Sequence, residues 1–191
     1  MKRKETHIRV AGFGGQGVMM FGQVLAYAAT IEEQNALWFP SYGPETRGGT
    51  ANCQIIISNE TIDSPIFNES DQLIVFNYPS LIKFSDKIKE NSFMFYNTSL
   101  ITEVVTLDKG KAIGIPCNDI AIKLGDVQVA NMVMMGAYLE ITKMFNQKVI
   151  VKAIEKFLGD KKSAMLQLNI EALNEGKKYI LNMSNEKRKI K

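Results

Sequence analysis

Cysteine and histidine are scarce in this sequence of 191 residues, and their scarcity limits the chemistry that the chain can perform alone. The two cysteines, Cys53 and Cys117, are far apart, and neither belongs to a Cys-x-x-Cys pair. A cluster with four cysteine ligands or a structural zinc site needs more ligands than these. We expect both to be reduced, buried and hydrophobic in character. The one histidine, His7, is expected to be a surface residue or to be satisfied by its neighbours.

Neither a strong excess of one charge nor a long apolar run marks the sequence. Lysine and arginine number 23 against 20 aspartates and glutamates, and four of the cations lie in the last five residues, so no nucleic-acid surface is indicated. No apolar run approaches the roughly 20 residues that a membrane-spanning helix needs. The first residues lack the apolar core of a secretory signal. We therefore expect a cytoplasmic protein without nucleic acid or membrane as a partner.

A glycine-rich turn between an apolar run and a helical pattern is the most informative feature that is present. The turn contains Gly12, Gly14, Gly15, Gln16 and Gly17 and satisfies G-x-G-x-x-G. Glycines before a helix are typical of an anion site, and equally of tight strand-to-helix packing. A side chain at Gly14 or Gly15 is expected to clash with the helix or to require a forbidden positive φ. No acidic residue ends the next apolar run and no Gly-Lys-Ser/Thr follows, so neither a dinucleotide site nor a P-loop is expected.

A second loop, residues 40–49, is shaped by prolines and glycines and carries polar side chains. Its candidates for binding are Ser41, Tyr42, Glu45 and Arg47. Because the loop follows a predicted strand, we expect it at the sheet edge that also holds the glycine turn, where open α/β sheets bind ligands. Arg47 is expected to hold a phosphate or a partner's carboxylate, unless it only pairs with Glu45 to shape the loop. Neither a catalytic constellation nor a metal site is apparent in the sequence.

The periodicity of apolar residues predicts strands alternating with helices, followed by a helical end. Strands are expected at residues 7–11, 37–39, 50–58, 72–77, 92–97, 103–107 and 112–115, and helices at 18–33, 80–89, 119–124, 129–145, 149–158 and 163–183. The pattern indicates a single domain, residues 1–191, with an α/β fold: three αβα layers around a mainly parallel or mixed, Rossmann-like sheet, and a helical C-terminal part. The methionines of the helix at 129–145 are expected to fill the core.

The two loops together resemble the gamma subunit of 2-oxoacid:ferredoxin oxidoreductases. The resemblance rests on residues 12–18 and 41–53 and extends through residues 62–65, 71–77, 131–134 and 169–176. The second loop is most similar to the 2-oxoglutarate members, although the branched-chain 2-oxoacid members look alike there. The indolepyruvate oxidoreductase small subunit shares the glycine opening. An alternative of a different class is a free-standing nucleotide-binding regulatory protein.

The resemblance implies one subunit of an enzyme that converts 2-oxoglutarate and coenzyme A into succinyl-CoA, carbon dioxide and reduced ferredoxin or another low-potential acceptor. It implies that alpha, beta and ferredoxin-like delta subunits are the partners, and that they hold thiamine diphosphate, magnesium and the iron–sulfur clusters. This chain would then be inactive alone and would bind no cofactor by itself. The glycine turn and the four polar residues of the second loop would lie beside coenzyme A or a partner subunit.

Overall fold

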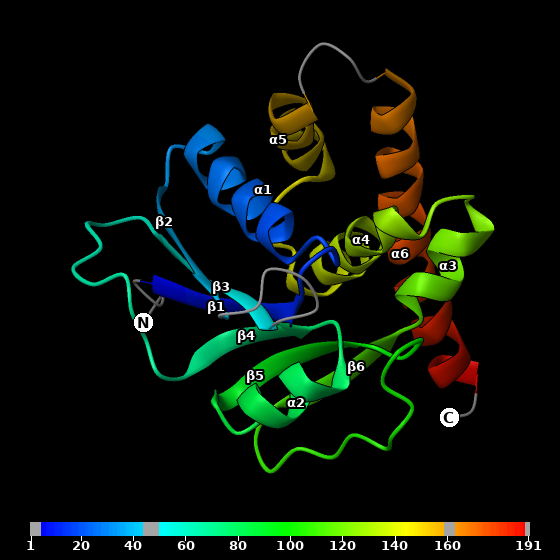
Figure 1. The fold of residues 1–191 in the computed structure, drawn as a ribbon, viewed down its shortest axis with the longest axis horizontal. Helices are drawn as coiled ribbons and strands as arrows, with labels where there is room; N and C mark the ends of the chain where they lie inside the picture. The colour runs from blue at the N-terminus through cyan, green and yellow to red at the C-terminus, as the bar shows by residue number, and fades with distance from the viewer. Residues whose placement is uncertain (1–4, 44–49, 159–162, 190–191) are drawn as a thin grey trace.

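A six-stranded sheet with helices on both faces forms the body of the molecule (Figure 1). The computed structural model describes residues 5–43, 50–158 and 163–189, with the backbone alone at residues 163 and 186–189. The strands are β1 (Glu5–Phe13), β2 (Asn35–Tyr42), β3 (Thr50–Ser58), β4 (Ser70–Val75), β5 (Ile88–Asn97) and β6 (Lys111–Ile115). Their order across the sheet is β2-β3-β1-β4-β5-β6.

The strand directions make the sheet mixed, which is one of the two forms that the sequence predicts. β1, β4, β5 and β6 pair in parallel, whereas β3 is antiparallel to both of its neighbours, β1 and β2. β2 therefore runs in the same direction as β1, and β3 alone among the described strands runs against the others. As a consequence, the carboxyl ends of β1, β2, β4 and β5 lie at one edge of the sheet.

The helices cover the two faces of the sheet unequally. They are α1 (Val18–Ile31), α2 (Tyr78–Phe84), α3 (Cys117–Lys123), the 3-10 helix η1 (Val127–Val129), α4 (Ala130–Thr142), α5 (Gln147–Leu158) and α6 (Ser163–Lys189). In Figure 1, α1, α4, α5 and α6 lie on one face and α2 on the other. The larger hydrophobic core lies under the first group, and a smaller core lies under α2. No helix in these described ranges is long and apolar enough to cross a membrane.

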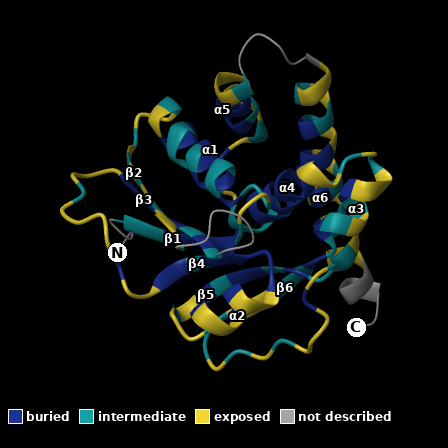
Figure 2. Cartoon of the chain, in the orientation of Figure 1, coloured by how far each residue is buried: buried dark blue, intermediate teal, exposed yellow. Residues whose placement is uncertain are grey.

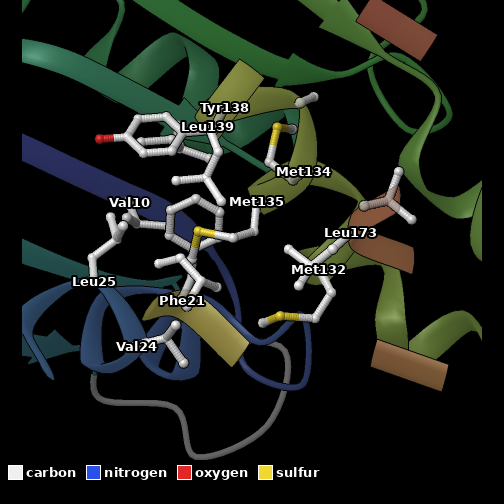
Figure 3. Close-up of a cluster of buried hydrophobic side chains, with 14 of the residues drawn as sticks. Val10, Phe21, Val24, Leu25, Met132, Met134, Met135, Tyr138, Leu139 and Leu173 are labelled. Carbon is white, nitrogen blue, oxygen red and sulfur yellow. The ribbon is translucent and has the colours of Figure 1, made fainter. Parts of the chain in front are cut away.

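α4 is the centre of the larger core, and Figure 2 shows it enclosed by the other elements. Ten of its 13 residues are buried, so the helix has no solvent-facing side over most of its length. Met132, Met134 and Met135 are fully buried among the aromatic and aliphatic side chains of Figure 3, which confirms that they fill the core. Gly136 allows α6 to approach closely, because a Cβ there would collide with the backbone carbonyl of Leu173.

Two predicted elements were wrong in the middle of the chain. Residues 103–107 form no strand and belong to the connection between β5 and β6. Val105 and Leu107 pack, partly buried, on the smaller core without strand pairing, while Val104 is 92% exposed. The predicted helix at 80–89 ends at Phe84, because the chain from Ile88 onward already pairs with β4.

The ends of the other helices differ from the predictions by a few residues. α1 ends before Glu33, and α4 ends before Lys143, because both of these residues adopt positive φ, of 58° and 52°. α6 continues to Lys189, beyond the predicted end at residue 183. These differences leave the order of elements unchanged.

Candidate functional site

The connections of the sheet create a crevice between the carboxyl ends of β1 and β4. β1 and β4 are adjacent and parallel, yet β1 continues into α1 on one face and β4 into α2 on the other. In open α/β sheets such a switch point is where ligands bind. The glycine turn lies directly at this crevice because it joins β1 to α1.

Part of the second loop reaches the same edge, as the sequence predicts. Gly12 pairs with Ala51 of β3, and Ala51 pairs with Tyr42 of β2, so the three residues lie in one row across the sheet. Ser41 and Tyr42 are both exposed there. Glu45 and Arg47 lie outside the described residues, and their expected contacts with a ligand, with a partner or with each other remain predictions.

The glycine turn has the features of a type II β-turn. The N–H of Gln16 donates to the carbonyl of Phe13 over 3.2 Å, and Gly15, at the third position, has a φ of 94°. Gly14 has no positive φ, and a Cβ there would meet nothing within 4 Å. The expectation that both positions exclude a side chain is therefore wrong for Gly14 and holds for Gly15 through its backbone conformation.

The most constrained glycine of the turn is Gly17, which directly precedes α1. Gly17 has a φ of 74°, and a Cβ there would collide with the side-chain amide of Asn131 from α4. The same amide donates to the carbonyl of Gly17 over 3.4 Å. Two independent constraints therefore act at Gly17, and the second comes from a residue distant in sequence.

The side chain of Gln16 links the turn to Asn77, in the connection between β4 and α2. Its Oε1 accepts hydrogen bonds from the N–H of Phe13 at 2.7 Å and from Nδ2 of Asn77 at 3.0 Å. Asn77 also caps α2, because its Oδ1 accepts from the N–H of Ser80 at 2.9 Å. A Cβ on Gly12 would lie 2.7 Å from Gln16 Oε1, so glycine at that position leaves room for the bond.

A second amide network holds the carboxyl end of β5. Asn97 is fully buried, and its Oδ1 accepts from the N–H groups of Ser99 at 3.3 Å and Cys117 at 3.1 Å. Its Nδ2 donates to Oδ1 of Asn118, in α3, at 2.8 Å. Sequence reasoning did not identify Asn77, Asn97 or Asn118. The signal that was available is the asparagine that ends each of the predicted strands 72–77 and 92–97.

A cavity of about 180 Å³ opens at the crevice. It is lined by Gly15, Gln16, Phe76, Asn118, Val127, Gln128 and Ala130. None of these residues has a charged side chain, and three of them carry an amide. Across the described parts of the chain, no group of three or more His, Cys, Asp or Glu side chains is placed to hold a metal ion. The cavity can form neutral hydrogen bonds and apolar contacts.

The thiols and the histidine lie outside this cavity. Cys53 and Cys117 are free and buried, as the sequence predicts, and burial raises the pKa of the Cys53 thiol to about 12 and that of Cys117 well above its ordinary value. His7 lies at the opposite edge of the sheet, where its Nε2 is 2.9 Å from Glu5 Oε2 and its ring stacks on Phe67. The prediction of a satisfied histidine is therefore confirmed.

Fold and site together define a doubly wound α/β protein with a crevice at its switch point. Residues 7–179 match the family model described as pyruvate ferredoxin/flavodoxin oxidoreductase, and the chain belongs to this family. The family resemblance that the two loops indicated is thereby confirmed.

Two relatives from Methanothermobacter marburgensis are equally identical to the chain but differ in length. The 2-oxoglutarate synthase subunit KorC is 34% identical over 187 residues, which covers 92% of this chain and 100% of the relative. The ketoisovalerate oxidoreductase subunit VorA is 34% identical over 173 residues, which covers 91% of this chain and 36% of the relative. The chain thus spans about a third of the length of VorA and is matched along the whole of KorC.

Solved structures share the fold over nearly the whole chain. The gamma subunit of a keto/oxoacid ferredoxin oxidoreductase from Geobacter sulfurreducens has a TM-score of 0.81 at 27% identity and covers 94% of this chain and 98% of its own. A 2-oxoglutarate:ferredoxin oxidoreductase from Magnetococcus marinus, with 2-oxoglutarate, coenzyme A and succinyl-CoA bound, has a TM-score of 0.86 at 26% identity and covers 95% and 32%. These likenesses confirm the predicted α/β fold with a helical C-terminal part.

Proposed function

We propose that this chain is the gamma subunit of a multisubunit 2-oxoacid:ferredoxin oxidoreductase. The observation that carries the proposal is the share of the known subunits that the chain matches: all of a KorC relative and 98% of the Geobacter gamma subunit. A regulatory protein that shared only the glycine turn would not match such subunits along their full length. The match therefore favours a separate subunit over a free-standing nucleotide-binding protein.

Within this proposal the 2-oxoacid is 2-oxoglutarate, which is converted with coenzyme A into succinyl-CoA, carbon dioxide and reduced ferredoxin or another low-potential acceptor. Four KorC relatives at 33–35% identity support this substrate, as does the Magnetococcus enzyme that binds 2-oxoglutarate and succinyl-CoA. A branched-chain 2-oxoacid is the second candidate because VorA is equally identical. The indolepyruvate and pyruvate relatives are more distant, at 28% and 27% identity.

The cysteines of this chain do not fit an iron–sulfur cluster, which such an enzyme requires. Two cysteines cannot supply the four thiolates of an iron–sulfur cluster, and Cys53 and Cys117 are buried as thiols on different elements. We therefore assign the clusters to the partner subunits, and with the family resemblance we also place thiamine diphosphate and magnesium in the alpha, beta and ferredoxin-like delta subunits. The contribution of this chain is to pack against those subunits and to border coenzyme A with the crevice at its switch point.

Native purification followed by activity assays tests the proposal. The chain is expected to co-purify with thiamine-binding and ferredoxin-like subunits, and the complex to reduce a viologen dye only when a 2-oxoacid and coenzyme A are both present. We expect kcat/KM for 2-oxoglutarate to exceed that for 3-methyl-2-oxobutanoate at least tenfold, and a reversed ratio would favour the second candidate. A chain that purifies alone, or that turns over a 2-oxoacid without partners, would refute the subunit assignment.

A further inference from the structure

The hydrogen bonds around Gln16 fix the orientation of its side-chain amide. A backbone N–H can only donate, so the atom that lies 2.7 Å from the Phe13 nitrogen must be the amide oxygen. Asn77 gives the same answer, because its oxygen is already used by the N–H of Ser80 and its Nδ2 must be the donor to Gln16. The remaining polar group of Gln16, in the wall of the cavity, is therefore its –NH2 group.

The same reasoning fixes Asn118. Backbone N–H groups of Ser99 and Cys117 both point to one atom of Asn97, which must be its oxygen. The other atom, Nδ2, donates to Asn118 over 2.8 Å, so Asn118 presents its oxygen to Asn97. Asn118 also lines the cavity, and its –NH2 group is the part left for a ligand.

Two residues that line the cavity, from different parts of the fold, thus each have their amide oxygen engaged and their –NH2 group left over. Within the described ranges, neither the –NH2 of Gln16 nor that of Asn118 has a protein acceptor. No lining side chain is charged, and the volume of about 180 Å³ is smaller than the roughly 300–1,000 Å³ of a complete small-molecule site. The cavity is therefore suited to one part of a larger ligand, a part that offers acceptor oxygens.

We propose that Gln16 and Asn118 bind an acceptor oxygen group of coenzyme A, either a phosphoryl or an amide carbonyl oxygen, in the switch-point cavity. The inference rests on the proposed function for the identity of the ligand and deepens it by naming the two donors. Coenzyme A carries both kinds of oxygen, in its phosphates and in its pantetheine arm.

Isosteric acids test the donors without removing the bonds that hold them. In Gln16→Glu and in Asn118→Asp, one carboxylate oxygen still accepts the existing hydrogen bonds, and only the –NH2 group is replaced by an acceptor. The matched control is Asn146→Asp, beyond the far end of α4 from Ala130, where the oxygen that accepts from Lys148 N–H at 3.0 Å is likewise kept. All three variants add one negative charge, and thermal melting followed by circular dichroism checks that each folds.

The assembled complex is assayed for the KM of coenzyme A and of 2-oxoglutarate. We expect Gln16→Glu and Asn118→Asp each to raise the KM for coenzyme A at least tenfold while the KM for 2-oxoglutarate stays within twofold, and Asn146→Asp to match the parent in both. Calorimetric titration of the assembled complex with adenosine 3′,5′-bisphosphate and with pantetheine identifies the oxygen, because the fragment that loses affinity in the variants is the one that carries it.

The outcomes separate this proposal from the proposed function. If the complex turns over 2-oxoglutarate and both cavity variants keep the KM for coenzyme A within twofold of the parent, the cavity assignment is overturned and the subunit assignment stands. If the parent complex turns over no 2-oxoacid, the subunit assignment fails. Asn118→Asp, on α3, carries the test alone should Gln16→Glu not fold.

Discussion

The glycine turn supports a graded prediction, because three of its glycines are constrained to different degrees. Alanine is introduced at Gly14, Gly15 and Gly17 in turn. Gly14 faces open space, Gly15 has a φ of 94° without a close neighbour, and Gly17 combines a φ of 74° with a collision against Asn131. The methyl group of alanine therefore meets no constraint at Gly14, one constraint at Gly15 and two constraints at Gly17.

The expected losses of unfolding free energy follow from these constraints. Gly14→Ala is expected to be neutral or to stabilise by up to about 1 kcal/mol, because alanine restricts the unfolded chain at a position whose backbone it can adopt. Gly15→Ala is expected to cost about 1–2 kcal/mol for a left-handed residue with a Cβ. Gly17→Ala adds about 1–3 kcal/mol of overpacking to that strain, for a total of about 2–5 kcal/mol.

Urea unfolding followed by circular dichroism measures the three free energies by linear extrapolation. A double variant, Gly17→Ala with Asn131→Ala, removes the side chain that the new methyl group meets. We expect it to lose at least about 1 kcal/mol less than the sum of the two single variants, as residues in contact do. Equal losses at Gly14 and Gly17, or strict additivity in the double variant, would refute this account of the turn.

Three further predictions concern the core. Gly136→Ala is expected to destabilise the chain by about 1–3 kcal/mol despite the better helix propensity of alanine, because the methyl group meets the backbone of α6. Urea unfolding measures whether the unfolding free energy falls or rises. The buried guanidinium of Arg9 lies 5.3 Å and 4.9 Å from the ring centroids of Phe67 and Phe84; its Nη2 donates to the Phe67 carbonyl over 3.1 Å, whereas its Nε has no partner among the described residues. Both Arg9→Met and Arg9→Ala lose that hydrogen bond, but methionine keeps apolar contact with the rings. Arg9→Ala is therefore expected to lose about 2–4 kcal/mol, and Arg9→Met at least about 1 kcal/mol less. Burial raises the pKa of Cys53 from about 9 to about 12, so the stability that the neutral thiol contributes is present below pH 9 and is lost as the pH rises toward 12. The decline of stability with pH is therefore expected to be shallower in Cys53→Ala. Ellman's reagent is expected to label neither Cys53 nor Cys117 before unfolding.

Local signals were sufficient for most of the elements and for the place of the glycine turn. Buried strands and amphipathic helices carry their periodicity in consecutive residues, and the turn is marked by glycines that its φ values require at Gly15 and Gly17. The position of Ser41 and Tyr42 at the same edge followed from one assumption, that their strand runs parallel to β1, and the register bears it out. The strand predicted at residues 103–107 was wrong because apolar residues at alternate positions, here Val105 and Leu107, can also pack on a core from a loop.

The hydrogen-bonded part of the site depends on contacts that no local pattern contains. The contacts of Gln16 with Asn77 and of Asn97 with Asn118 depend on the pairing of β4 and β5 in the sheet, which places the ends of these strands beside the turn. The clash that makes Gly17 necessary comes from Asn131, on a helix that packs over α1 from the second half of the chain. A glycine motif in the sequence therefore indicates where a site lies, and the partners that orient its donors become visible only in the fold.

The candidate residues for ligand recognition are of two kinds: neutral amides in the cavity wall, and the charged residues Glu45 and Arg47. The described wall of the cavity is neutral and is held by buried amides, which orient donors without the desolvation cost that a buried ion would incur. The charged candidates, Glu45 and Arg47, belong to the segment that joins β2 to β3, whose ends are clamped by a 2.8 Å hydrogen bond from Gly43 to Thr50. A positive charge from Arg47 in that segment would act on an anionic ligand at this edge. Under the proposed function, raising the ionic strength is then expected to weaken the binding of coenzyme A through Arg47, whereas the neutral amide donors are less sensitive to salt.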